Sequence, residues 1–175
     1  MDLYIIRHGE SQGNIGLDVE DPKLTELGHK QAELLALRLR NIDFDAILSS
    51  PLTRAIQTAT PLSELRNTPI TVINELHEVG AFGDESLEDA QKRAKDVVAK
   101  IREEYGDKEN VIAFAHGTFN NHFIKAACGI TSGDDFNFCQ ENTGLTCIKF
   151  MPDGKTKIEF SNDYCHLASV DEPEF

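Results

Sequence analysis

The sequence predicts an α/β fold, a three-layer sandwich in which a mainly parallel central sheet has helices on both faces. Strand-like apolar runs alternate with segments of helical spacing as far as about Cys128, which is typical of parallel strands joined by helices. Two of these runs, residues 3–6 and 111–115, are apolar throughout, as expected of buried strands. The last two candidate strands flank Pro152-Asp153-Gly154, a turn sequence that predicts an antiparallel hairpin at the edge of the sheet.

Six segments are predicted to be strands, because apolar and β-branched residues gather in them and turn residues flank them. They are residues 3–6, 44–48, 70–73, 111–115, 146–150 and 157–160.

The first predicted helix begins after Thr25, and its apolar residues recur with helical spacing. They are Leu27, Leu34, Leu35, Leu37 and Leu39. The second helix is expected to have Ser50 as its N-cap and Pro51 as its first residue, a pairing that suits a helix start. Pro61 is expected to end or bend this helix, because proline lacks the backbone N–H that a helix interior needs.

The third helix is predicted to extend from Ser86 to Tyr105, since Ser86 and Asp89 resemble a capping box. Its apolar side is expected to consist of Ala90, Ala94, Val97, Val98 and Ile101. A fourth helix follows the strand at 111–115 and ends near Cys128.

Length and charge restrict the possible functions. The chain has 175 residues, of which 40% are hydrophobic, and residues 1–175 are therefore expected to form one domain. The formal net charge of -13 at pH 7 opposes binding to nucleic acid or to an anionic membrane surface. A phosphate group would have to be captured in a local pocket, which favours a small phosphorylated metabolite as the partner.

No targeting or metal-binding signal is found. The amino terminus lacks the basic start and the long apolar run of a signal peptide, and no stretch has the length of a membrane-spanning helix. The four cysteines include no Cys-x-x-Cys pair, and the histidines outside the motifs below have no metal-ligand spacing. These features predict a cytoplasmic protein with reduced thiols, no metal and no cofactor.

Basic side chains follow three of the predicted strands. Arg7 and His8 follow the first strand, Arg54 comes shortly after the second, and His116 follows the strand at 111–115. The carboxyl ends of parallel strands meet at one edge of the sheet, where α/β proteins bind their ligands. We therefore expect these four side chains to surround a single anion.

The segments that carry these residues resemble the histidine phosphatase superfamily, in its phosphoglycerate mutase-like branch. The resemblance rests on Arg7-His8-Gly9-Glu10, on residues 49–59 (Ser-Ser-Pro-Leu-Thr-Arg-Ala-Ile-Gln-Thr-Ala) and on Ala115-His116-Gly117, which occur in the family's order, each after a strand-like run. It extends to about Cys128 and implies a phosphoglycerate mutase-like fold. The chain departs from the pattern at Thr118 and Asn120-Asn121, where many relatives carry a glycine and later an arginine, so an additional phosphate or carboxylate contact there is in doubt.

The candidate binding residues suit a phosphate group. The planar guanidinium groups of Arg7 and Arg54 can each bind two phosphate oxygens and keep their charge at any relevant pH. His116 and Asn14 would add further donors. The family resemblance implies the same set.

His8 is the candidate nucleophile. A neutral imidazole can attack phosphorus through one nitrogen while the other donates a hydrogen bond, here to a backbone carbonyl near Gly9. The resemblance implies that His8 forms a phosphohistidine and that His116 stabilises the transferring group.

Glu78 is the candidate general acid. It would protonate the leaving oxygen and later take a proton from the attacking water. Glu78 lies in Glu75-Leu76-His77-Glu78 after a predicted strand, and the resemblance implies an acid in a similar Leu-x-Glu setting. Glu75 remains the alternative, because a shift of one residue in register would exchange the exposure of the two side chains.

The predicted function is that of a phosphoric monoester hydrolase which acts on small phosphate monoesters without a metal. Larger relatives insert a lid between the positions of Glu78 and Ser86, and the short segment here predicts a pocket open to water, which favours hydrolysis over phosphoglycerate mutase-type transfer. A phosphohistidine protein phosphatase and a non-catalytic module that binds phosphorylated ligands are further alternatives. The presence of Glu78 weighs against the former, and that of His8 against the latter. Sugar phosphates, phosphoglycerate-type acids and nucleoside or cofactor-precursor phosphates all remain open as substrates.

Overall fold

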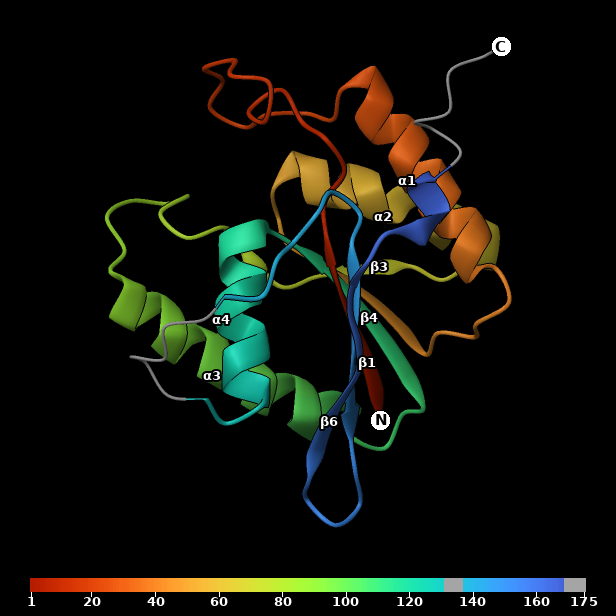
Figure 1. Ribbon diagram of the computed structural model, residues 1–175, viewed down its shortest axis with the longest axis vertical. Helices are drawn as coiled ribbons and strands as arrows, with labels where there is room; N and C mark the ends of the chain where they lie inside the picture. Colours follow the sequence, from red (N-terminus) through yellow and green to blue (C-terminus); the bar gives the residue numbers. More distant parts are fainter. Residues whose placement is uncertain (131–136, 169–175) are drawn as a thin grey trace.

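A six-stranded sheet runs through the centre of the molecule in the order β3-β2-β4-β1-β5-β6 (Figure 1). The computed structural model describes residues 1–130 and 137–168. The strands are β1 (Asp2–Arg7), β2 (Ala46–Ser49), β3 (Ile70–Val72), β4 (Asn110–Ala115), β5 (Leu145–Phe150) and β6 (Thr156–Asp163). The strands β1 to β4 are mutually parallel, whereas β5 and β6 run antiparallel to their neighbours. The predicted α/β sheet with an antiparallel hairpin at its edge is confirmed.

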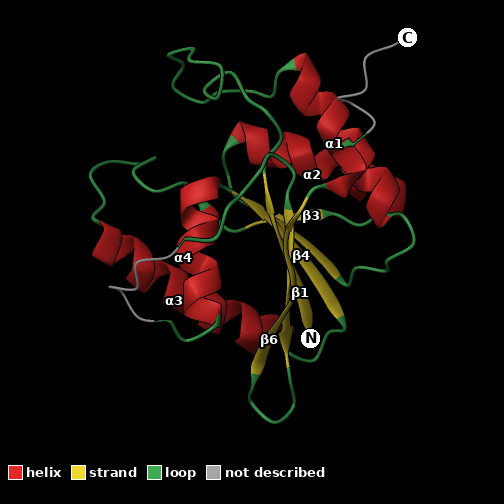
Figure 2. Cartoon of the chain, in the orientation of Figure 1, coloured by secondary structure: helices red, strands yellow, loops and turns green. Residues whose placement is uncertain are grey.

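Two helices cover each face of this sheet (Figure 2). Helices α1 (Glu26–Leu39) and α2 (Thr53–Arg66) enclose one apolar core with the sheet, and α3 (Leu87–Tyr105) and α4 (Gly117–Ala127) enclose the other. Two single-turn helices, η1 (Asn74–Leu76) and η2 (Cys165–Leu167), complete the described elements. Within residues 1–130 and 137–168, no helix combines the length and hydropathy needed to cross a lipid bilayer.

The strand β4 connects the two cores. Its side chains alternate between the faces, as strand geometry requires, so that Val111 and Ala113 pack toward α3 and α4 while Ile112 and Phe114 pack toward α1 and α2. All four are fully buried. β4 lies between β1 and β2 and pairs with both, whereas β1 and β2 do not pair with each other. It is therefore β4 that joins these two strands into one sheet.

Helix α1 begins as predicted but turns a different face to the core. Thr25 is the N-cap, and its hydroxyl accepts a hydrogen bond from the Gly28 N–H. The prediction that Leu27 and Leu37 belong to the apolar face is wrong, since they are 38% and 51% exposed. The buried face consists of Gly28, Gln31, Ala32, Leu35, Ala36 and Leu39. Small residues there allow α1 to approach the sheet closely, and the extra leucines lie outside the buried arc.

Helix α2 differs from the prediction at its start. Its first residue is Thr53 and its N-cap is Leu52, so the assignment of Ser50 and Pro51 to these positions is wrong. The carboxylate of Asp21, from a distant loop, accepts a hydrogen bond from the Thr53 N–H at 3.2 Å and provides the missing cap. Pro61 does not end the helix, which continues to Arg66. Pro61 has no N–H and cannot donate a helical hydrogen bond. Burial of the next residue, Leu62, in the core offsets the free energy that this lost bond costs.

Helix α3 agrees with its prediction in full. Ser86 is the N-cap and accepts a hydrogen bond from the Asp89 N–H at 3.1 Å. The predicted apolar side is buried against the sheet and α4.

Candidate active site

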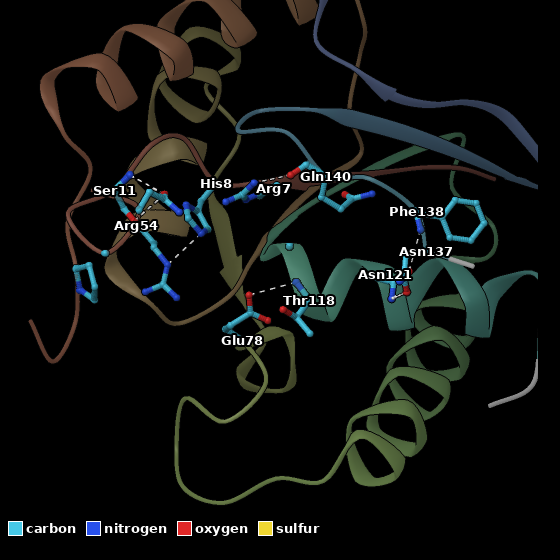
Figure 3. Close-up of a pocket in the computed structure, with 14 residues that line it drawn as sticks. Arg7, His8, Ser11, Arg54, Glu78, Thr118, Asn121, Asn137, Phe138 and Gln140 are labelled. Carbon is cyan, nitrogen blue, oxygen red and sulfur yellow. Dashed lines mark hydrogen bonds between the residues drawn. The ribbon is translucent and has the colours of Figure 1, made fainter. Parts of the chain in front are cut away.

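A cavity of about 590 Å³ opens at the carboxyl ends of β1 and β4 (Figure 3). We call one part of its wall the basic side, which consists of Arg7, His8, Asn14 and Arg54. Another part of the wall, the amide side, consists of Asn121, Asn137 and Gln140, of which Gln140 lies next to Arg7. Glu78 and Thr118 lie between the two sides in Figure 3.

The register of the sheet brings distant residues to this cavity. Arg7 pairs with Ala115 across β1 and β4, so that His8 and His116 follow neighbouring strand ends, with ring centroids 5.1 Å apart. On the other side of β4, the Ser50 N–H donates to the Phe114 carbonyl at 2.9 Å. This continuation of the β2–β4 ladder leads the chain into α2 and its first-turn residue Arg54.

His8 is held in one tautomer. Its Nδ1 lies 2.7 Å from the Gly9 carbonyl oxygen, which can only accept, so Nδ1 carries the proton. Its Nε2 accepts a hydrogen bond from Arg54 Nε at 3.1 Å, which requires an unprotonated nitrogen. Burial, together with the positive charges of Arg54 and Arg7, lowers the pKa of His8 from 6.5 to about 3, although the bond to Gly9 opposes this shift. At neutral pH the ring is therefore uncharged, with a lone pair at Nε2. The expected backbone acceptor near Gly9 is confirmed.

Close packing fixes the backbone beside His8. The Gly9 N–H donates to Thr58 Oγ1 of α2 at 3.0 Å. On the other side, a Cβ atom at position 9 would lie 2.7 Å from the carbonyl oxygen of Gly28 in α1. Only glycine permits this approach, so α1 and α2 together hold the turn that orients the imidazole.

His116 lies fully buried behind the cavity. Its Nε2 is 2.7 Å from Ser50 Oγ, while its Nδ1 is buried with no hydrogen-bond partner. Burial, followed by the nearby His8 and Arg54, holds the pKa of His116 well below 6.5. When the Ser50 hydroxyl donates to Nε2, the ring proton resides on Nδ1.

The two arginines of the basic side keep their charge although burial lowers the pKa of both guanidinium groups. Arg7 donates through Nη1 to the backbone carbonyl of Gln140, and its buried Nε has no partner. Buried donors without partners are uncommon in folded proteins. The basic side therefore presents fixed cationic donors to an anion.

Asn14 points an amide donor at the same space. Its Oδ1 accepts hydrogen bonds from the Ser11 N–H at 2.9 Å and from the Ser11 hydroxyl at 3.0 Å. These bonds orient the side chain and leave its NH₂ group for a ligand.

Glu78 lies on the cavity wall, and Glu75 does not. The Glu78 carboxylate accepts hydrogen bonds from the backbone N–H groups of Val79 at 2.9 Å, Phe119 at 3.0 Å and Thr118 at 3.3 Å, the last two in the first turn of α4. Glu75 instead points to solvent and pairs with Lys100 at 3.6 Å. Of the two candidates, Glu78 alone has access to a substrate in this cavity.

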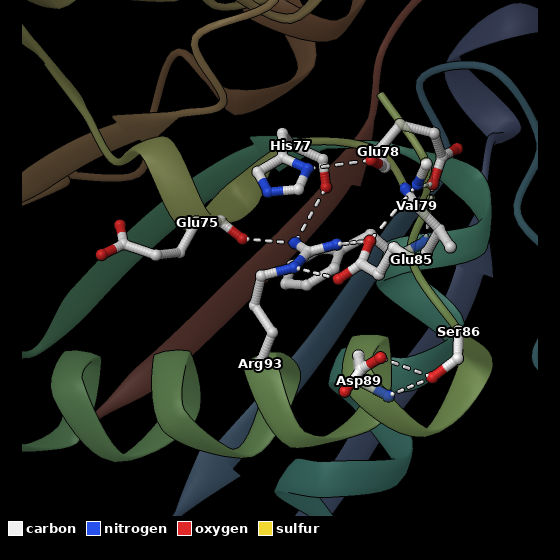
Figure 4. Close-up of polar contacts among 10 residues, drawn as sticks. Glu75, His77, Glu78, Val79, Glu85, Ser86, Asp89 and Arg93 are labelled. Carbon is white, nitrogen blue, oxygen red and sulfur yellow. Dashed lines mark hydrogen bonds and ion pairs between the residues drawn. The ribbon is translucent and has the colours of Figure 1, made fainter. Parts of the chain in front are cut away.

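Arg93 of α3 holds the segment that carries Glu78 (Figure 4). Its Nη1 donates to the carbonyls of Glu75 and His77 at 2.6 and 3.0 Å. Its Nε and Nη2 donate to the two carboxylate oxygens of Glu85 at 2.7 and 2.8 Å, and its guanidinium lies 4.4 Å above the Phe119 ring. This cluster joins the loop after β3 to α3 and α4.

The structure thus places five of the six predicted site residues on one cavity wall, with His116 directly behind. Sequence reasoning missed Ser50 as the partner of His116, because its position before Pro51 indicated a helix cap. It also missed Arg93 and the amide side. Arg93 lies in a regular amphipathic helix, and residues 137–140 belong to no motif. Within the described ranges, no three His, Cys, Asp or Glu side chains lie close enough to hold a metal ion.

Comparison with known proteins agrees with this arrangement. The model of the histidine phosphatase superfamily (branch 1) matches residues 3–84 and 79–163. The chain is 27% identical to a putative phosphoserine phosphatase 2 of Hydrogenobacter thermophilus, over 96% of this chain and 98% of the relative. It is 32% identical to an adenosylcobalamin/alpha-ribazole phosphatase of Salmonella typhimurium, over 80% of this chain and 70% of the relative.

The fold is likewise shared with solved structures. A putative alpha-ribazole-5'-P phosphatase from Escherichia coli superposes with a TM-score of 0.82 at 23% identity, covering 94% of this chain and 97% of that one. The match to the family model spans nearly the whole described chain, from β1 to the end of β6. This protein therefore belongs to the histidine phosphatase superfamily (branch 1).

Proposed function

We propose that this protein is a metal-independent phosphatase that hydrolyses small phosphate monoesters through a phosphohistidine at His8. The observation that carries the proposal is the state of the His8 ring, whose Nδ1 is bound to the Gly9 carbonyl while its Nε2 keeps a lone pair beside Arg54. Relatives named as phosphoserine and alpha-ribazole phosphatases support the same reaction class. We further propose that residues 1–175 act as one catalytic domain.

In the first step, His8 Nε2 attacks phosphorus, and the bond from phosphorus to the ester oxygen breaks. Arg7, Arg54 and Asn14 bind the phosphoryl oxygens and offset the charge that repels the nucleophile. Protonated Glu78 donates its proton to the departing oxygen, so that a neutral alcohol leaves.

In the second step, water attacks the phosphohistidine, and the phosphorus–nitrogen bond breaks. The Glu78 carboxylate takes a proton from that water, which restores the acid and releases inorganic phosphate. The position of Glu78 on the cavity wall, between the basic side and Asn121 in Figure 3, supports a role in both steps.

The rim of the cavity favours water over a second phosphoryl acceptor. The residues from 80 to 84 are exposed, and Phe82, 66% exposed, packs edge-on against His77. In the described chain, none of residues 80–84 lines the cavity. A mutase must exclude water from its phosphohistidine, so an uncovered rim supports hydrolysis.

The test compares the parent protein with His8→Ala in the hydrolysis of p-nitrophenyl phosphate. We expect turnover by the parent and a loss of at least about 10⁴-fold in the variant. His29→Ala, which removes an exposed histidine of α1 outside the cavity, should retain the parent rate. Acid-quenched parent protein should carry phosphate on His8. A parent without activity on this ester and on a panel of phosphorylated metabolites would instead indicate a non-catalytic binding module.

A further inference from the structure

The cavity extends well beyond the space that a phosphate group needs, and its second half has a chemistry of its own. At about 590 Å³, it has the size of pockets that hold whole small molecules. If Glu78 protonates the ester oxygen, the alcohol part of the substrate must lie past Glu78 as seen from the basic side. In Figure 3, Thr118, Asn121 and Asn137 lie on that side of Glu78.

The amide side is organised by its own hydrogen bonds. Asn121 donates through Nδ2 to Asn137 Oδ1 at 3.0 Å, and its Oδ1 accepts from the Phe138 N–H at 3.0 Å. Each amide nitrogen carries two hydrogens, and each carbonyl oxygen has two lone pairs. After these bonds are made, the amide side still offers both donors and acceptors to a ligand.

The positive charge of the cavity is confined to the basic side. Among the described residues, Arg7 and Arg54 are the only Lys or Arg side chains that line it, and both belong to the phosphate-binding end. Lys125, further along α4, is buried and lines a neighbouring groove that shares Thr118, Asn121 and Asn137 with this cavity, but it does not line the cavity itself. The residues outside the described ranges contain no Lys, Arg or His in the sequence.

Negative charge is also present around the basic side, because Glu78 and Glu141 lie near enough to Arg7 to raise the pKa of its guanidinium. Glu78 is protonated in the proposed first step, so it is the lack of a cation at the amide side that disfavours a substrate carboxylate. Such a carboxylate would leave water and find no cation of its own there. Hydroxyl groups meet no such obstacle, because they both donate and accept hydrogen bonds and carry no charge.

From this contrast we infer that the substrates are phosphate monoesters of neutral, hydroxyl-rich alcohols, of the sugar or nucleoside type, and that esters bearing a carboxylate are excluded. The inference rests on the proposed function. It specifies which phosphate monoesters that same site accepts.

Two ligands with one carbon skeleton test the inference. Racemic glycerol 3-phosphate and racemic 3-phosphoglycerate differ only in whether C1 is a hydroxymethyl group or a carboxylate. Each is used as a competitor of p-nitrophenyl phosphate, so that its inhibition constant is measured even where its own turnover is slow. We expect the constant for glycerol 3-phosphate to be at least about tenfold lower, because a carboxylate loses its hydration without gaining a cation at the amide side.

A positive charge introduced on the amide side should reduce or remove this preference. Asn137→Arg places a guanidinium there, and Asn137→Gln is the matched neutral control, since both variants change the contact with Asn121. Relative to Asn137→Gln, we expect Asn137→Arg to lower the inhibition constant of 3-phosphoglycerate about tenfold through a charge-assisted contact. Glycerol 3-phosphate should change by less than about twofold.

The possible failures are distinguishable. The inference is wrong if 3-phosphoglycerate binds the parent as well as or better than glycerol 3-phosphate, or if Asn137→Arg changes neither inhibition constant. In either case, hydrolysis of p-nitrophenyl phosphate by the parent would still support the proposed function. If the parent does not hydrolyse p-nitrophenyl phosphate, the proposed function fails, and the inference fails with it.

Discussion

The basic side and the amide side of the cavity are built in different ways. On the basic side, Arg7 ends β1, His8 follows it, and Arg54 lies in the first turn of the helix after β2, so backbone contacts between neighbouring strands set their positions. The amide side comes from one face of α4 and from residues 137–140, which belong to no helix or strand. Reactive groups need exact placement, which a sheet provides, whereas groups that select a substrate can reside on more variable segments. Glu78 stands between the two, on a loop that Arg93 fixes.

The largest effect expected within this comparison is on the basic side. Arg54→Lys keeps the charge but loses the Nε–H that contacts His8 and the planar fork that binds two phosphate oxygens. We expect kcat/KM to fall about 100-fold for p-nitrophenyl phosphate and for glycerol 3-phosphate alike, because both share the phosphate. Arg66→Lys, at the other end of α2 and outside the cavity, is the control. A loss confined to one ester would show that Arg54 contacts the alcohol part.

A more selective loss is expected at Glu78. Glu78→Gln removes the proton donor, so we expect glycerol 3-phosphate hydrolysis to fall about 100-fold. The loss on p-nitrophenyl phosphate should stay below about threefold, because its phenolate departs without a proton. Glu75→Gln, the exposed alternative, should leave both rates near those of the parent. Equal losses on both esters would remove Glu78 from the role of acid.

A smaller loss with the same signature is expected at Arg93. Arg93→Lys retains one charge but gives up most of the contacts with Glu85 and with the carbonyls of Glu75 and His77. We expect about a tenfold loss on glycerol 3-phosphate and little change on p-nitrophenyl phosphate. Arg102→Lys, on the same helix but over the Phe150 ring, is the control. Partial unfolding would lower both rates together, so the ratio between them reports the placement of Glu78.

The last prediction concerns the protonation state of His8 on the basic side. It involves no substitution, and no change in rate is expected near neutral pH. Because the pKa of His8 is lowered to about 3, its ring should stay neutral from pH 7 to pH 5, with the proton on Nδ1. Nitrogen-15 NMR of labelled histidine checks both points, and titration of His8 near pH 6.5 would contradict them. Between pH 6.5 and 3 the unfolded chain holds more protons on this residue than the folded protein does. The free energy of unfolding should therefore fall as the pH is lowered through that window.

Sequence patterns predicted the sheet and the approach of the strand-end residues, because both follow from short-range signals. An apolar run followed by Arg7 and His8 defines a strand and its end together, and parallel pairing then brings that end next to His116. The choice of Glu78 over Glu75 needed the structure, since it depends on how the loop after β3 meets α4. Both residues are glutamates in the same short segment after β3, so the sequence alone does not distinguish them.

Other features depend on contacts between distant segments and had no local signal. The cap of α2 is Asp21, more than thirty residues before the helix it caps, so Ser50 seemed the better candidate. Leu27 and Leu37 have the spacing of a core face, yet small residues decide which side of α1 meets the sheet. Asn121 and Asn137 acquire a role only because residues 137–140 pass over α4.

The central place of β4 has a consequence for how the protein comes into being. A ribosome makes β1 and β2 first, together with His8 and Arg54, but these strands gain a common neighbour only when residues 110–115 emerge and insert between them. A nascent chain that stops short of that point can carry its nucleophile and one arginine without any enclosure for an ester. Catalysis in this molecule would thus report that the chain has been made and folded at least as far as β4.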